Sequence, residues 1–176
     1  IGAGAGGSAR GLMVGGIGAG VGGDFEGIGL GGVGFGAGGR IRGIVVSGGG
    51  IGAGGDITGL SIAGIGVGSG GHLRWVSIAG IGVGAPRITG LVAAPGVGGG
   101  DIRGVALAPA YFRIEERGSL RGVSVSAYND IRGSQRGLVI GLINIAEELH
   151  GLQVGLINIA RNKDRFPVLP LLNYHP

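Results

Sequence analysis

The chain has 176 residues, a formal net charge of +4, 48 glycines and no cysteine. This length suits a single domain with a core of its own, and the 44% apolar content excludes a disordered chain. The lack of cysteine excludes disulfides and thiolate metal sites. Glycine recurs mostly at every second residue and not at every third, which excludes collagen.

The sequence repeats with a period of about sixteen residues. The unit Asp56–Gly71, DITGLSIAGIGVGSGG, follows RIRGIVVSGGGIGAGG and is followed by HLRWVSIAGIGVGAP. The fourth position of each unit, the marker position, falls at Gly11, Gly27, Gly43, Gly59, Trp75, Gly90, Gly104, Gly122, Gly137 and Gly151. This pattern predicts an all-β fold, a β-solenoid of roughly eleven stacked two-stranded coils with a repeat of about 14–16 residues.

Within one coil the apolar residues alternate with a period of two, which predicts two short strands. The alternation changes phase at Ala63-Gly64, so we expect one turn there and a second at 69–71. Leu60 and Ile62 of the first strand and Val67 of the second are predicted to point inward. The first-strand residues predicted to point outward are Met13, Gly29, Val45, Ser61, Ser77, Val92, Ala106 and Ser124.

The second strand of each coil is predicted to present a bare glycine surface to its surroundings. Glycine inside a strand costs conformational entropy and packs no side chain, and close approach of another surface is the usual reason for it. We therefore expect a self-assembly face made of Gly18, Gly20, Gly34, Gly36, Gly52, Gly54, Gly66, Gly68, Gly82 and Gly84.

Charged residues recur at one corner of the coil, three positions before the marker. They are Asp24, Arg40, Asp56, His72, Arg87 and Asp101. Since neighbouring coils lie about 4.8 Å apart, Arg40 is predicted to lie between Asp24 and Asp56. We interpret this column as a structural ladder of ion pairs, and a ligand groove is the alternative.

The composition changes after residue 110, although we expect one continuous domain. Residues 1–110 form regular glycine-rich coils, 111–117 an excursion loop, and 118–176 less glycine-rich coils. The proline-containing end, with Pro167 and Pro170, is expected to cap the solenoid. Ile1–Gly7 aligns with the second half of a coil, so earlier sequence or another chain is expected to complete that coil. The candidate partner loop comprises Tyr111, Phe112, Arg113, Glu115, Glu116 and Arg117.

No motif for catalysis or cofactor binding stands out. The three histidines lack partners at metal-ligand spacing, and the glycine fingerprint at 18–23 is a by-product of the repeat. We expect no enzyme activity, no cofactor and no metal. The 5% aromatic content argues against nucleic-acid binding, and charges interrupt the apolar runs too often for a membrane-spanning segment.

The repeated GLINIA at 141–146 and 155–160, with the trailing VLPLLN, resembles glycine-rich bacterial surface-repeat proteins of unknown function. This resemblance implies a solenoid and a cell-surface or extracellular location. The sequence thus favours a non-enzymatic structural protein that assembles with copies of itself, as a filament or surface-layer subunit. The alternative is a monomeric spacer or binding module that recognises an unidentified surface partner through residues 110–117.

Overall fold

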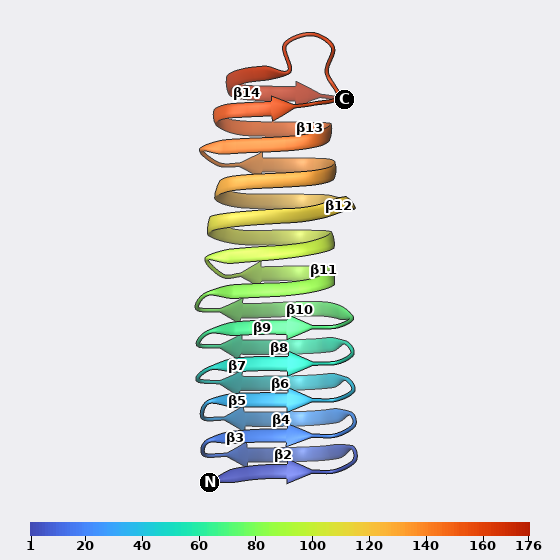
Figure 1. The fold of residues 1–176 in the computed structure, drawn as a ribbon, viewed down its shortest axis with the longest axis vertical. Coiled ribbons are helices and arrows are strands. Elements are labelled where there is room, and N and C mark those ends of the chain that lie inside the picture. The colour runs from blue at the N-terminus through green and yellow to red at the C-terminus, as the bar shows by residue number, and fades with distance from the viewer. The chain divides into compact units, whose positions relative to one another are not determined.

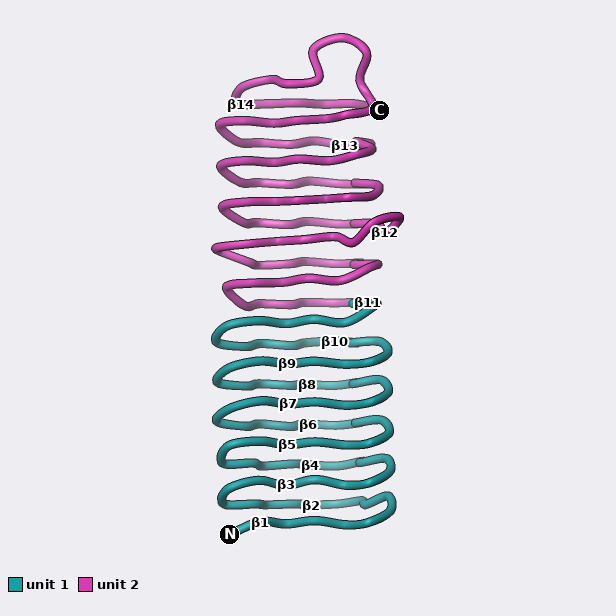
Figure 2. Tube along the Cα trace, in the orientation of Figure 1, with its two compact units in different colours: residues 1–89 teal, residues 90–176 magenta.

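The computed structural model describes all residues 1–176, and every regular element is a β-strand. The chain winds as a parallel β-solenoid of about ten turns with a spacing of about 16 residues. The predicted fold class is therefore confirmed, with a number of coils close to the expected one. The chain divides into two compact units, residues 1–89 and 90–176 (Figure 2).

Unit 1 consists of two parallel sheets that the chain visits in turn (Figure 1). The front sheet contains β1 (Gly2–Ala5), β3 (Gly18–Val21), β5 (Gly34–Ala37), β7 (Gly50–Ala53), β9 (Gly66–Ser69) and the first residues of β11 (Gly82–Ala93). The back sheet contains β2 (Ala9–Gly15), β4 (Phe25–Gly31), β6 (Ile41–Ser47), β8 (Ile57–Ala63) and β10 (His72–Ala79). Residues sixteen apart are paired, as in Ile41 with Ile57, so equivalent positions form straight columns.

The turns of each coil lie where the change of phase predicts them. β8 ends at Ala63 and β9 ends at Ser69, and bends follow both strands. The marker glycines have positive φ, for example +128° at Gly59, where a Cβ atom would lie only 1.9 Å from the carbonyl oxygen of Gly43. A side chain at this position would therefore collide with the coil before it.

The predicted direction of the first strand is wrong. Ser61 is fully buried, whereas Leu60 and Ile62 lie on the outer surface of the back sheet. Val67 of the second strand is buried as predicted. The predicted outward residues that are buried instead are Gly29, Val45, Ser61, Ser77, Val92, Ala106 and Ser124.

The reason for this inversion is the narrow space between the two sheets. A Cβ atom at Gly29 would lie 2.4 Å from the ring of Phe35, so these two positions face each other across the core. The equivalent pair in the next coil is Val45 and Ile51. A small residue on the first strand thus makes room for a large one on the second, because a filled interior cannot hold two large side chains.

Unit 2 contains β12 (Gly96–Ile140), which bends through successive coils, β13 (Ile143–Ala160) and β14 (Val168–His175). β12 and β13 are parallel, with Asn129 paired to Asn144. β14 runs antiparallel to β13, and Pro170 lies within it.

The segment 110–117 is not an excursion loop. It lies inside β12, and the side chains of Phe112 and Ile114 are completely buried. The prediction failed because residues 111–115 alternate between surface and interior as in a strand, although Glu115, Glu116 and Arg117 are all exposed and Arg117 has a positive φ of 64°.

A ladder of buried asparagines runs through the interior of unit 2. The Nδ2 atom of Asn129 donates to Oδ1 of Asn144 at 2.8 Å, and Nδ2 of Asn144 donates to Oδ1 of Asn158 at 2.7 Å. Gly155 leaves room for this ladder, because a Cβ atom there would lie 2.6 Å from Nδ2 of Asn144. The spacing of the two GLINIA segments therefore reflects stacked, mutually bonded asparagines.

Candidate functional site

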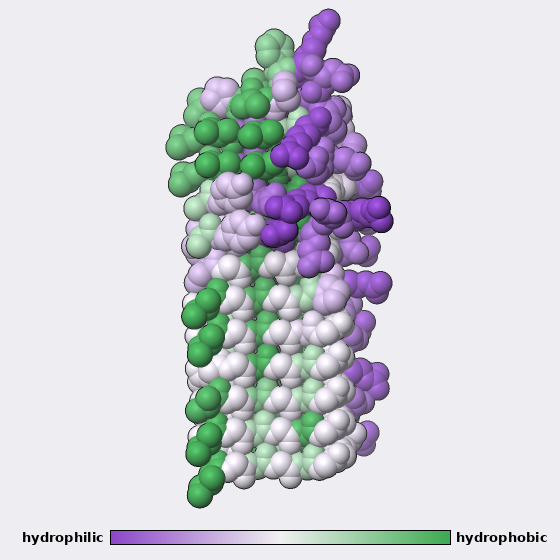
Figure 3. All heavy atoms as spheres, in the orientation of Figure 1, coloured by the Kyte–Doolittle hydropathy of each residue, from purple (hydrophilic) through white to green (hydrophobic).

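Unit 1 presents a glycine face on the outer side of its front sheet. Within each short strand the alternate residues, such as Phe35 and Val67, fill the core, and the glycines between them point outward. In Figure 3 these glycines form pale rows, with charged side chains along one border and apolar side chains along the other. The glycine face comprises Gly18, Gly20, Gly34, Gly36, Gly50, Gly52, Gly66, Gly68, Gly82 and Gly84.

One glycine expected on this face lies elsewhere, and another glycine occupies its place. Gly54 lies in the bend after β7, whereas Gly50 is paired with Gly34 and Gly66 and so belongs to the rows. A shallow, open groove of about 800 Å³ runs along one of the two rows and the neighbouring bends. Its glycines are Gly4, Gly20, Gly36, Gly52 and Gly68 of the row and Gly6, Gly22, Gly38, Gly54 and Gly70 of the bends.

The glycine face has free space above it. A Cβ atom at Gly52 or Gly68 would meet no atom within 4 Å, and at Gly18 it would make only an ordinary contact of 3.6 Å. None of these three glycines has positive φ. The single chain therefore has no steric need for glycine here, in contrast to the marker position of Gly59.

The back sheet presents an aliphatic face that the sequence did not lead us to expect. Its outward side chains form two straight columns, and several are well exposed: Leu12 by 70%, Ile28 by 47% and Ile44 by 43%. The sequence did contain a signal for this orientation, since Ser61 and Ala63 are small residues that suit a narrow interior. The aliphatic face comprises Leu12, Val14, Ile28, Leu30, Ile44, Val46, Leu60, Ile62, Val76 and Ile78.

The predicted charge column occupies one corner of unit 1, but its contacts differ from those expected. Arg40 is 3.0 Å from Asp24, whereas Asp56 is paired with Arg74, which comes from a neighbouring column, at 3.7 Å. Arg40 therefore does not bridge two aspartates. Arg87 is exposed in β11. In unit 2, Asp101 accepts a hydrogen bond from Ser119.

The corner aspartates also bind the backbone of the following coil. Oδ1 of Asp24 accepts the backbone N–H of Arg40 at 2.7 Å, and Oδ1 of Asp56 accepts that of His72 at 2.9 Å. The bond from the Arg40 backbone, aided by the Arg40 guanidinium, holds the pKa of Asp24 below its ordinary value. Asp24 and Asp56 thus bond the backbone of the coil that follows each of them.

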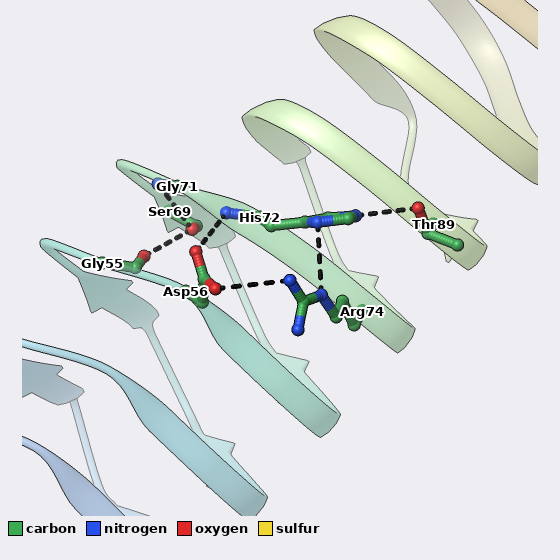
Figure 4. A network of polar contacts seen from close by, with 7 residues as sticks. All are labelled: Gly55, Asp56, Ser69, Gly71, His72, Arg74 and Thr89. Atoms are coloured by element: carbon green, nitrogen blue, oxygen red, sulfur yellow. Dashed lines mark hydrogen bonds and ion pairs between the residues drawn. The ribbon is translucent and has the colours of Figure 1, made fainter.

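Figure 4 shows how His72 completes this corner network. Nε of Arg74 donates to Nδ1 of His72 at 3.2 Å, so Nε2 carries the proton and donates to Oγ1 of Thr89 at 2.8 Å. Ser69 bridges the turn below, donating to the carbonyl oxygen of Gly55. All side-chain groups drawn are used in contacts between coils.

The residues of the candidate partner loop separate into two groups. Phe112 is in the core, and Arg113 is half-buried. Tyr111, Glu115, Glu116 and Arg117 are exposed, and the ring of Tyr111 stacks on Tyr128 with centroids 5.7 Å apart. A groove of about 440 Å³ lies nearby, lined by Glu116, Tyr128, Asp130, Arg132, Ile145, Glu147 and Arg161.

Comparison with known proteins gives no family assignment. No family model, no curated protein and no solved structure matches this chain. No three side chains of His, Asp or Glu lie together in a group that could hold a metal ion. None of the elements is a helix long and apolar enough to cross a membrane.

Proposed function

We propose that this chain is a non-enzymatic structural protein that assembles with copies of itself through the glycine face of unit 1. The observation that carries the proposal is the free space above that face. Side chains would fit at Gly52 and Gly68, and yet the rows contain glycine in every coil. Because glycine weakens a strand, its repeated use supports close contact with another flat surface.

The second surface is a copy of the same face. Two sheets with ordinary side chains pack about 10 Å apart, and without side chains they can approach much more closely. The amide and carbonyl groups of the front strands are already paired along the solenoid, for example between β5 and β7. Contact between two glycine faces therefore requires no new main-chain hydrogen bonds and adds dispersion and Cα–H···O contacts between the glycine rows.

We also propose that the assembly is located outside the cell. The resemblance of the GLINIA segments to bacterial surface-repeat proteins supports an extracellular filament or a surface layer as the assembled form. A regular solenoid whose glycine face carries no charged side chain is suited to repeated packing.

The test compares arginine substitutions on and off the glycine face. We expect wild-type protein to form long assemblies in electron microscopy, and Gly52→Arg and Gly68→Arg to reduce them to small particles. Gly7→Arg is the matched control, because Gly7 also has no atom within 4 Å of its Cβ position but lies in the bend after β1. Assemblies of normal length in both face variants would refute the proposed contact.

A second function, binding of a partner by unit 2, is favoured by the stacked Tyr111 and Tyr128 beside the charged groove. Deleting residues 110–117 would remove core side chains, so the test uses exposed positions only. Tyr111→Ala combined with Glu116→Ala, at the groove, should abolish adhesion of the purified monomer to a surface without changing its melting temperature. Unchanged adhesion would exclude this site.

A further inference from the structure

We propose that the aliphatic face of unit 1 is a second self-association surface, which pairs with the aliphatic face of another copy. This inference rests on the proposed self-assembly and names a contact on the opposite side of unit 1 from the glycine face. It is carried by the composition, flatness and borders of the back sheet.

The composition of the face is that of an interface core. Its two columns contain only leucine, isoleucine and valine, and no charged or polar side chain interrupts them in the five strands from β2 to β10. Contiguous apolar surface of this kind is rare on monomeric soluble proteins and marks a contact with another molecule. An exposed sheet that remained in water would carry polar residues at these positions.

The face is also flat, since equivalent residues stay in register from coil to coil, as in Ile28, Ile44 and Leu60. In Figure 2 the rungs of unit 1 remain nearly parallel from β1 to β10. Untwisted sheets of many strands are typically stabilised by stacking, and here the back sheet stacks on the front sheet through the core, as between Gly29 and Phe35. The outer surface is therefore flat before any partner binds. The most regular partner for such a surface is an identical one.

The size of the face sets the strength of the contact. The two aliphatic columns span five strands and about four residues of each strand, roughly 320 Å² on each copy, from the rise per residue and the strand spacing. Two copies together cover about 640 Å², which places this contact among the small, weak interfaces.

The border of the face indicates how two copies are oriented. A polar and charged column, with Arg42, Thr58 and Arg74 among its members, runs beside the aliphatic columns on the same outer surface. A two-fold axis parallel to the solenoid axis of unit 1 places the first aliphatic column of each copy over the second column of the other. Both charged columns then lie at the outer margins, in contact with water, which matches the polar rim of known interfaces.

Trp75 supplies an independent observation at one end of this face. It is the only tryptophan, its side chain is 70% exposed, and it lies in β10 next to Val76. It also has φ of +85° at a marker position where the other nine markers are glycine. A bulky residue held in this strained conformation points to a function, and tryptophan is the residue most enriched among energetically dominant interface contacts.

Self-association through both faces determines the direction in which the assembly grows. Each face pairs with its own kind around a two-fold axis, and the two faces lie on opposite sides of unit 1. A molecule with two such contacts does not close into a dimer, because each added copy exposes a further free face. The assembly therefore grows sideways, with glycine and aliphatic contacts alternating.

The experiment uses Ile44→Lys in the full chain, with Thr58→Lys as its matched control. Thr58 lies on the same surface of the next strand but in the polar column. Sedimentation velocity should show wild type and Thr58→Lys as large assemblies and Ile44→Lys as particles no larger than a dimer. An unpaired charge buried in the contact should weaken association by at least about 100-fold. The emission of Trp75 should shift to shorter wavelength with assembly in wild type but not in Ile44→Lys.

The glycine variants separate this inference from the proposed function. Gly52→Arg should also stop at dimers, held by the aliphatic face, and Gly52→Arg combined with Ile44→Lys should be monomeric. Wild-type-like assemblies of Ile44→Lys would overturn the aliphatic contact and leave the glycine contact intact. If Gly52→Arg formed wild-type-like assemblies while Ile44→Lys was dispersed, the glycine contact would be overturned and the aliphatic contact would remain. Monomeric wild-type protein would overturn both. Ile44→Thr, with circular dichroism, controls for loss of folding.

Discussion

Lys163 donates a hydrogen bond from Nζ to Oδ1 of Asn173 at 2.8 Å, so the only lysine of the chain caps a completely buried amide. Asn173 lies in β14, and its Nδ2 donates to the carbonyl oxygen of Asn158 at 3.4 Å. The ammonium group thus provides a donor where the next coil would otherwise supply one. The asparagine ladder of unit 2 ends in this contact.

Removal of this cap should destabilise unit 2. In Lys163→Met the Oδ1 atom of Asn173 loses its donor while remaining buried, which costs about 1–3 kcal/mol. Urea unfolding should report the loss. Arg165→Met is the control, because Arg165 is exposed in the segment between β13 and β14. Equal stabilities of the two variants would show that the Lys163 contact contributes nothing.

The contact between Gly29 and Phe35 can be tested by replacing this pair of residues with the corresponding pair of the next coil. Gly29→Val alone should cost about 1–3 kcal/mol by overpacking, because its side chain meets the Phe35 ring. Phe35→Ile alone leaves a void beside Phe25, whose ring lies 4.8 Å away. The double variant reproduces the Val45 and Ile51 arrangement of the next coil.

Denaturant unfolding of the two single variants and the double variant forms a double-mutant cycle. We expect the double variant to be more stable than the sum of the single losses predicts, by about 2 kcal/mol. Additive losses would mean that positions 29 and 35 do not share the same space.

The ion pair of Asp24 should make stability depend on pH in the acid range. Contacts with Arg40 lower the pKa of Asp24 from its ordinary value of 3.8. A group with a lowered pKa in the folded state stabilises the fold above its unfolded pKa, and this contribution is lost as the pH falls through the folded pKa. The difference in melting temperature between wild type and Asp24→Asn should therefore be largest near neutrality and shrink below pH 3.8.

The control for this experiment is Asp164→Asn, in the loop before β14. Its carboxylate takes part in none of the five ion pairs. The difference between this variant and wild type should stay the same over the acid range. A difference for Asp24→Asn that persisted to pH 2 would contradict the assigned contact.

The repeat was sufficient to predict the coils, their turns and the glycine rows except at Gly50, because each depends on backbone conformation repeated along the chain. The direction of the first strand was not predictable by the rule that apolar residues point inward. Ser61 is buried because the space opposite Val67 is small, and Leu60 is outside although it is larger. That information lies in the partner strand across the core, and not in the alternation itself.

The charge column was only partly predictable for a related reason. The spacing brought Arg40 and Asp24 to adjacent coils, which the structure shows. It did not reveal that Asp56 would contact Arg74 from a second column, because that choice depends on side-chain reach. The identical GLINIA segments were apparent in the sequence, but they did not reveal the asparagine ladder. Only the structure shows that Asn144 lies in the interior and bonds to Asn129 and Asn158.

The parallel arrangement of unit 1 also determines how it would respond to force. Its main-chain hydrogen bonds run from one coil to the next, as between β6 and β8, and therefore lie along the direction in which coils are stacked. Tension applied in that direction loads a single coil boundary at a time, so the unit would peel coil by coil at low force. Each released coil of sixteen residues would lengthen the molecule by about 50 Å, from the extended length per residue. Tension across the coils would instead shear many bonds together and meet far greater resistance.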